Sequence, residues 1–213
     1  MVDSPSAAER VHTAIRSGII NGFYPPGSML SESELAASHG VSRTPVRAAL
    51  SRLQEEEWVT VYPKRGVLVR ELSAQEAYDF ADARHLLESS CVQRTSPADR
   101  GRLADRLTAL LDAQESAIAA RELPALIELM LTFHRSFVEA AGNETLLELY
   151  DRLNARHAMM MIQRRESFFA RSEAVMAEHR ALIAQLRTGD WAAFTATLRT
   201  HMIDADSLQP GIG

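Results

Sequence analysis

The sequence predicts a mainly α-helical protein with a small mixed N-terminal domain, residues 1–72, and an all-helical C-terminal bundle, residues 73–213. Two observations predict this division. Five of the eight prolines lie before residue 64, and the only clear strand pattern lies at 58–62 and 67–69. From residue 73 onward the apolar residues follow a helical period almost without interruption, with no linker rich in Gly or Ser and no repeat.

Composition excludes several classes of protein. The chain has 213 residues, of which 46% are hydrophobic and 24% charged, as in ordinary globular proteins. No apolar run reaches the length of about 18 residues that suggests a membrane span. The first ten residues lack the layout of a signal peptide, so we expect a cytoplasmic protein. A single cysteine, Cys91, can form neither an internal disulfide nor a thiolate-rich metal site.

The net charge of −5 argues at first against a nucleic-acid partner, whose phosphates require positive charge. The charge is unevenly distributed, however. Residues 1–72 carry eight basic and eight acidic side chains, whereas residues 73–213 carry 15 basic and 20 acidic ones. Within 41–70 six basic residues face three acidic ones. The acidic total therefore does not exclude DNA binding by the N-terminal domain.

The N-terminal domain follows a winged helix-turn-helix pattern. A first helix is predicted at 6–21, and a capping box at 31–34 opens a short helix, 32–38, that ends at Gly40. Ser42 then caps a longer helix that directs Val46 and Leu50 inward. A short helix, a turn containing Gly and a longer helix form a helix-turn-helix, and the hairpin with its tip at 63–66 is the wing.

The second helix of such a motif enters the DNA major groove with its N-terminal residues. Two arginines lie in that first turn, where the helix dipole favours acidic residues. Their placement therefore favours contact with an external anion over a role as ordinary surface charges. A wing carrying basic residues would reach phosphate or the minor groove, or would serve only solubility. Arg52 is expected to pair with Glu55 or Glu56 instead. The candidate DNA-binding residues are Ser42, Arg43, Thr44, Pro45, Arg47, Lys64, Arg65 and Gly66.

Six helices are predicted in the second domain, at 73–95, 99–120, 124–141, 144–165, 170–188 and 190–206. A capping box at 73–76 begins the first, Pro124 suits a first turn, and Gly142 and Gly189 lie where helices end. Three of the seven histidines, His134, His179 and His201, fall on different predicted helices. Separated by 45 and 22 residues, they form no local metal motif and can meet only if their helices pack side by side.

The N-terminal motifs resemble the GntR family of bacterial transcriptional regulators. The resemblance rests on segments 26–36, 41–50 and 65–69, which agree with the family in order and spacing. It implies that Ser42, Arg43, Thr44, Arg47 and Gly66 touch operator DNA. Two departures occur: Ala48 replaces the usual Glu after the second Arg, and Glu57 replaces a usual Gly. We expect the missing carboxylate beside Arg47 to loosen base choice.

The second domain is similar to the FadR-type C-terminal domain, the FCD domain. Segments 133–143, 178–183 and 200–202, together with Arg84 and Glu88, carry the similarity. It implies a bundle of six or seven helices that often holds a divalent metal through three His and one Asp beside a cavity for a small organic acid. His134, His179 and His201 occupy the histidine positions, and Met130 stands where the Asp is expected.

Met130 offers a soft, neutral thioether that suits Zn²⁺ poorly, so a fourth bond would go to water or effector. Three alternatives remain: the histidines bind Zn²⁺ or Ni²⁺ with an open position, bind metal too weakly to matter, or hold an anion. Arg84 is the candidate for an effector carboxylate, and its alternative is a salt bridge to Glu88. Residues 159–161 with 168–169 are interpreted as core or dimer packing rather than pocket lining.

These features predict a ligand-responsive DNA-binding regulator that acts as a homodimer on double-stranded operator DNA and senses a small molecule, expected to be a carboxylate. A metal-dependent enzyme using the histidines is the alternative. It is disfavoured because the sequence has no nucleophile elbow, no catalytic motif on a strand and no obvious general base beside the histidines. An architectural DNA-binding protein would be far more basic.

Overall fold

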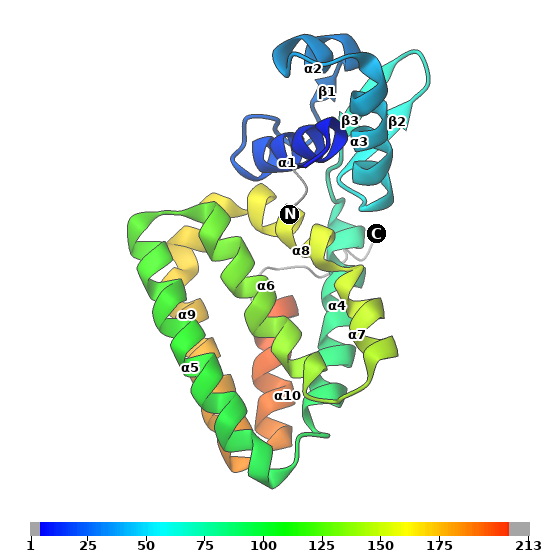
Figure 1. Cartoon of the computed structure of the whole chain (residues 1–213). Coiled ribbons are helices and arrows are strands. Elements are labelled where there is room, and N and C mark those ends of the chain that lie inside the picture. Colours follow the sequence, from blue (N-terminus) through cyan, green and yellow to red (C-terminus); the bar gives the residue numbers. More distant parts are fainter. Residues whose placement is uncertain (1–4, 205–213) are drawn as a thin grey trace. The chain divides into compact units, whose positions relative to one another are not determined.

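The computed structural model describes residues 5–204, which divide between Glu71 and Leu72 into two compact units. Figure 1 shows the helices and strands of both units. Among residues 5–204 no helix is both long and apolar enough to cross a membrane.

The N-terminal unit is a winged helix-turn-helix, as the sequence predicts. Its three strands pair antiparallel in the order β1-β3-β2, and the register of β2 and β3 runs from Val59 opposite Val69 to Tyr62 opposite Gly66. Strand β1 is not predicted, because two residues are too few for an alternating pattern. The elements are α1 (Ala7–Ile20), β1 (Met29–Leu30), α2 (Glu32–Ser38), α3 (Arg43–Glu55), β2 (Val59–Tyr62) and β3 (Gly66–Val69).

The core of this unit forms where α1 packs on α3 and α3 packs on α2 and β2. Apolar residues spaced three or four apart on α1 and α3 share one face of each helix, and that face is buried. Glu57, just after α3, has a φ of 64°, which explains why glycine is usual there. The buried residues include Val11, Ile15, Ile19, Leu35, Val46, Leu50, Leu53, Trp58, Val67 and Val69.

The predicted capping contacts of α2 and α3 are absent. Ser31 and Ser42 are the N-cap residues, but neither side chain makes a capping hydrogen bond. The Ser31 hydroxyl instead lies 2.7 Å from that of Ser33. The capping-box prediction for α2 is therefore wrong in its contacts, although the helix begins where it was predicted.

The C-terminal unit is an all-helical bundle, again as predicted. Helix α5 packs against α6 and α9, and α4 packs against α6 and α10. Figure 1 shows these helices running alongside one another. The elements are α4 (Ala74–Val92), α5 (Pro97–Ala120), α6 (Leu123–Glu139), α7 (Glu144–Asp151), α8 (Asn154–Gln163), α9 (Arg165–Thr188), α10 (Trp191–Arg199) and the π-helix η1 (Thr200–Asp204).

Local signals explain several helix ends in the bundle. Ser73 and Glu76 form the predicted capping box at the start of α4, and Pro124 lies in the first turn of α6. Gly189 ends α9 with a φ of 75°, a left-handed conformation that glycine adopts without strain.

Three predicted helices differ from the structure. The helix predicted at 170–188 begins earlier, because α9 starts at Arg165. The helix predicted at 144–165 is divided into α7 and α8 by a turn at Arg152 and Leu153. No Pro or Gly marks this break, so the sequence pattern could not reveal it. The helix predicted at 190–206 changes from α to π geometry at Thr200, and its residues 205–206 lie outside the described part. Such π segments occur often at functional sites.

Candidate functional site

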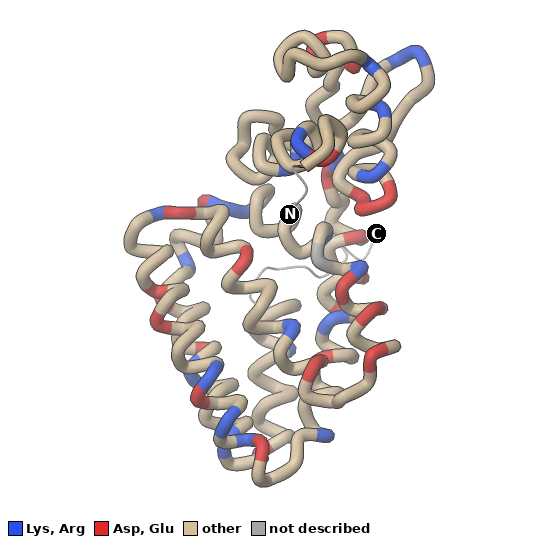
Figure 2. The backbone as a smooth tube through the Cα atoms, viewed as in Figure 1, with Lys and Arg blue, Asp and Glu red and all other residues tan. Residues whose placement is uncertain are grey.

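The N-terminal unit contains a groove of about 540 Å³ between the start of α2, the start of α3 and the β2–β3 hairpin. Its lining includes five of the predicted DNA-binding residues: Arg43, Arg47, Lys64, Arg65 and Gly66. Figure 2 shows basic positions on α3 and at the hairpin tip. The other three, Ser42, Thr44 and Pro45, lie at the start of α3 but do not line the groove.

The turn of the β2–β3 hairpin places two cations on the surface, and Gly66 fixes the position of this turn. Lys64 and Arg65 are exposed in the turn, and Lys64 has a φ of 63°. Gly66 has a φ of 117°, and a Cβ there would lie 2.9 Å from the Leu30 carbonyl oxygen. Only glycine therefore lets β3 approach β1 this closely, which holds the tip beside α3.

The Arg47 guanidinium is already hydrogen-bonded within the domain. Its Nε donates to the Glu32 carboxylate over 2.8 Å. The sequence interpretation missed Glu32 because it treated residues 31–34 only as the start of a helix. Arg52 Nε donates to Glu56 over 2.9 Å at i+4, which confirms the intramolecular pairing predicted for it.

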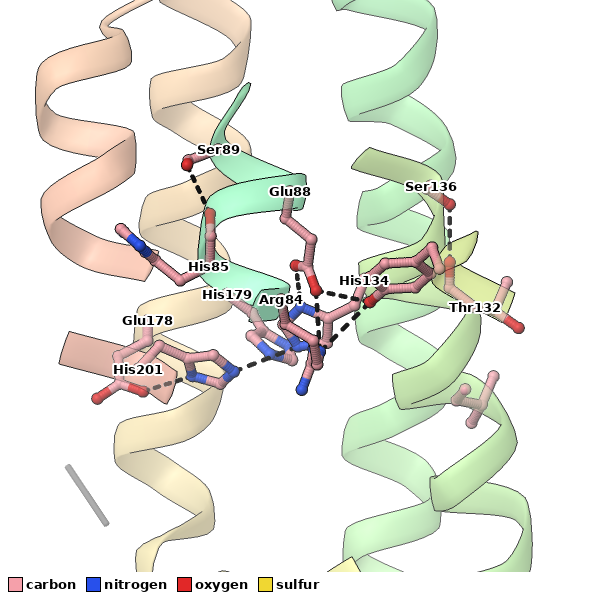
Figure 3. Close-up of polar contacts among 12 residues, drawn as sticks. Arg84, His85, Glu88, Ser89, Thr132, His134, Ser136, Glu178, His179 and His201 are labelled. Carbon is pink, nitrogen blue, oxygen red and sulfur yellow. Dashed lines mark hydrogen bonds and ion pairs between the residues drawn. The ribbon is translucent and has the colours of Figure 1, made fainter. Parts of the chain in front are cut away.

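The C-terminal unit brings the three predicted histidines together in its interior. His134 lies on α6, His179 on α9 and His201 on η1, and one ring nitrogen of each lies within 4.8 Å of the others. His134 and His179 are buried and His201 is half-buried. The Nε2 atoms of His134 and His201 are 3.3 Å apart (Figure 3).

The opposite nitrogen of each ring faces an oxygen acceptor. Nδ1 of His134 lies 2.8 Å from Glu88, and Nδ1 of His201 lies 2.8 Å from Glu178. Nδ1 of His179 lies 2.9 Å from Oε1 of Gln114, whose amide nitrogen donates to the Leu129 carbonyl at 3.3 Å. Because these partners accept, each Nδ1 carries the proton and each Nε2 presents a lone pair.

Three lone pairs therefore point into one small space. Nε2 of His179 is buried and has no hydrogen-bond partner among the described residues. Lone pairs this close repel one another unless a cation lies between them. Carboxylates and amides that fix the outer nitrogen of a ring are the usual second layer of a metal-binding histidine. The geometry therefore fits a divalent metal held by three neutral imidazoles.

Burial keeps the His134 and His179 rings neutral. It lowers the pKa of each group well below the usual value, and the nearby charge of Arg84 lowers both further. The neutral ring is the form that binds a metal, since a protonated nitrogen has no lone pair to offer.

Behind the histidines lies a buried polar network from α4 and α7. Glu88 Oε1 accepts from Arg84 Nε over 3.0 Å and from the Tyr150 hydroxyl over 2.6 Å. The structure thus contains the Arg84–Glu88 salt bridge. Nη2 of Arg84 is buried and, within the described part of the chain, unpartnered. Burial lowers the pKa of Arg84, but Tyr150 and Glu88 outweigh it and leave the pKa raised.

A small cavity of about 60 Å³ opens beside the histidines. His201 and His157 lie in its wall next to Met130, which is buried on α6 one turn before His134. Burial, followed by the charge of Arg84, lowers the pKa of His157 well below the usual value. The other lining residues are Met160, Met161, Arg164, Ser167, Phe168, Arg171 and Val175.

The packing interpretation of residues 159–161 and 168–169 is wrong in part. Met159 is core, whereas Met160, Met161 and Phe168 line the cavity. Successive helical residues point about 100° apart, so three consecutive methionines cannot all serve one purpose.

Sequence reasoning also missed the partners of the histidines. His157 has no spacing that singles it out, and Glu178 adjoins His179 in sequence but bonds to His201. The sequence showed no obvious general base beside the histidines, whereas the structure places the carboxylates of Glu88 and Glu178 on the Nδ1 atoms of His134 and His201. Only the packing of the helices could reveal these pairs.

Comparison with known proteins agrees with both domains. Residues 7–69 match the model of the bacterial regulatory proteins of the gntR family, and residues 79–204 match that of the FCD domain. An HTH-type transcriptional regulator of Agrobacterium vitis is 35% identical over 146 residues, which cover 66% of this chain and 85% of the relative. The gluconate operon transcriptional repressor of Bacillus licheniformis is 25% identical over 203 residues, which cover 93% and 83%.

A solved structure, the putative transcriptional regulator GntR from Rhodococcus sp. RHA1, has the same fold. Its TM-score is 0.80 at 24% identity, and the match covers 95% of this chain and 97% of the other. The winged helix-turn-helix, the helical bundle and both family matches agree, and the relatives are regulators rather than enzymes. The chain therefore belongs to the GntR family of bacterial transcriptional regulators, with a DNA-binding N-terminal domain and a ligand-sensing FCD domain.

Proposed function

We propose that this regulator senses a small organic acid through a divalent metal held by Nε2 of His134, His179 and His201. The single observation that carries the proposal is the convergence of the three Nε2 lone pairs, each fixed by an acceptor on the opposite nitrogen. Three neutral imidazoles suit Zn²⁺ or Ni²⁺ and leave a coordination position open. When bound, such a metal supplies positive charge that attracts an anionic ligand.

Because Met130 stands where an Asp ligand is expected, the effector carboxylate becomes the group that would bring negative charge to the ion. With no carboxylate among its ligands, the ion would have no negatively charged group bound to it directly. An effector carboxylate supplies that charge. The unpartnered Nη2 of Arg84 adds a second, charge-assisted donor, while Glu88 keeps the guanidinium in place through Nε.

The remainder of the effector is proposed to occupy the cavity beside His157 and His201. A cavity of about 60 Å³ has room for roughly four water-sized groups, so the effector is small. Met160, Met161 and Phe168 give this cavity an apolar wall, and methionine side chains adapt readily to different shapes.

On the DNA side, we propose a cytoplasmic homodimer that presents two α3 helices to a palindromic operator with half-sites about one helical turn apart. Arg43 and Arg47 would contact base edges in the major groove, and Lys64 and Arg65 would contact phosphates or the minor groove. Effector binding would change operator affinity by roughly 5- to 150-fold, the usual range of allosteric coupling.

Calorimetric titration with a panel of short carboxylic acids tests the proposal, combined with gel-shift of DNA from upstream of the gene. We expect one or more acids to bind the Zn²⁺-loaded protein, to bind much more weakly after chelation and to change the gel-shift. Arg84→Lys should weaken binding of the acid while keeping a positive charge beside Glu88. His85→Ala is the control, because it alters a buried histidine that is not one of the three proposed ligands. His85 lies on α4 with its Nε2 3.3 Å from the Thr195 carbonyl oxygen, and its loss should not affect acid binding. Effector affinity unchanged by chelation would eliminate the metal-bridged site.

A further inference from the structure

Glu32 and Arg47 form an ion pair inside the groove that faces DNA in the proposed function. Arg47 Nε donates to Glu32 Oε2 over 2.8 Å, from the third helix to the first turn of the second. The Arg47 side chain is 67% exposed and that of Glu32 28% exposed. The guanidinium is therefore held at its Nε edge while the rest of the group faces the groove.

This contact limits how the arginine can read a base. Guanidinium can pair with the O6 and N7 acceptors of guanine through its two Nη groups or through Nε and one Nη. Glu32 occupies Nε, so only the two Nη groups remain as a fork. A fixed guanidinium also loses less rotational freedom when it meets a base.

The electrostatic setting supports a role in specificity rather than affinity. The groove is lined by Arg43, Arg47, Lys64 and Arg65, all of which would attract phosphate. Glu32 adds negative charge to this same surface, which weakens attraction to any DNA. A carboxylate there weakens general DNA binding, although in the first turn of α2 it also suits the helix dipole. Glu32 differs from Glu34 in this turn by its hydrogen bond to Arg47.

We infer that Glu32 is a positioning residue that sets the base preference of Arg47, resting on the proposed contact of Arg47 with the operator. The family pattern has a carboxylate directly after this arginine, where this chain has Ala48. Glu32 supplies a carboxylate to Arg47 from the neighbouring helix. Base choice at the guanine read by Arg47 is therefore retained despite Ala48.

The test compares Glu32→Ala with Glu34→Ala in the full-length protein. Glu34 is a matched control because it lies in the same first turn of α2, lines the same groove and carries the same charge. Each variant is titrated by fluorescence anisotropy against a set of operator duplexes, in each of which one base pair is replaced. An unrelated duplex is titrated as well. Glu32→Gln, which keeps an acceptor, and Arg47→Ala complete the set.

Arg47→Ala should lose roughly 5- to 150-fold discrimination at one base pair, the value of one arginine–guanine contact. Glu32→Ala should lose at least about 5-fold at that same base pair. Glu32→Gln should retain part of the discrimination. Glu32→Ala and Glu34→Ala should each bind the unrelated duplex slightly more tightly, since each removes one negative charge.

Equal discrimination by Glu32→Ala and Glu34→Ala would overturn the inference while leaving DNA reading by Arg47 intact. Full discrimination by Arg47→Ala would instead show that this arginine does not read the operator, so the proposed contact fails as well. The two failures are thus distinguished by different variants in one experiment.

Discussion

Nε2 of His134 and Nε2 of His201 face each other at 3.3 Å in the interior of the helical domain, with both Nδ1 atoms bonded to carboxylates. A hydrogen bond between them would require one ring to give up its Nδ1 proton or to carry a second proton. A divalent cation shared with His179 removes the repulsion of all three rings at once. The predictions for the sensor domain follow from this arrangement.

Removal of a carboxylate that bonds to the Nδ1 atom of a proposed ligand should weaken metal binding without removing a ligand. Glu178→Gln keeps the size of the side chain that bonds to His201 Nδ1 but removes its charge. Loss of such a partner usually costs about 10- to 100-fold in metal affinity. Competition titration with a fluorescent Zn²⁺ chelator measures this. Glu173→Gln, on an exposed position of the same helix, should leave the affinity unchanged, and equal effects of the two variants would contradict the assignment.

Met130→Asp should place a carboxylate one turn before His134, where the family pattern expects one. Met130 is 2% exposed, so an unpaired aspartate there is costly without metal. We expect the melting temperature of the chelated variant to fall below that of the natural chain, and the Zn²⁺-loaded variant to recover most of the loss. Met130→Leu, which stays apolar, should show no such metal-dependent rescue. A chelated Met130→Asp protein as stable as the natural one would be inconsistent with the burial of this position.

The hairpin tip should contribute to DNA affinity without sequence preference. Lys64→Ala and Arg65→Ala should each reduce the slope of log K against log salt concentration by about one, uniformly across operator and unrelated duplexes. Arg10→Ala removes a cation from α1, outside the groove, and serves as the control. An unchanged slope in both tip variants would mean that the wing does not reach phosphate.

Acid should destabilise the chelated protein. Burial lowers the pKa of His134, His157 and His179 in the folded state, whereas the unfolded chain titrates near the ordinary histidine value of about 6.5. As pH falls below that value, the unfolded chain takes up protons that the folded one does not, so folding becomes less favourable. Burial raises the pKa of Glu88, which opposes this effect through one group against three. The midpoint of urea unfolding should fall between about pH 7.5 and 5.5; a constant or rising midpoint would contradict it.

Much of the architecture follows from local signals in the sequence. The helix-turn-helix, the wing and the bundle were readable because apolar spacing, Ser73 with Glu76, Pro124 and Gly189 each act within a few residues. The break between α7 and α8 was not readable, since no Pro or Gly marks it. It lies between Tyr150, which bonds to Glu88, and His157, which lines the cavity.

The candidate site was only partly readable. The histidine positions could be named through family resemblance, but their meeting depends on the packing of α6, α9 and η1. Glu32 on Arg47 and Gln114 on His179 join residues that are 15 and 65 positions apart. No periodic pattern links such pairs, because they arise from the packing of helices against one another.

The metal content of the purified protein tests the central claim most directly. Elemental analysis by mass spectrometry should find about one Zn²⁺ or Ni²⁺ per chain in the natural protein after dialysis against metal-free buffer. His179→Ala should lose most of that metal, while His85→Ala should retain it. Metal absent from the natural protein even after incubation with Zn²⁺ and Ni²⁺, or an equal content in His179→Ala, would contradict the proposed site.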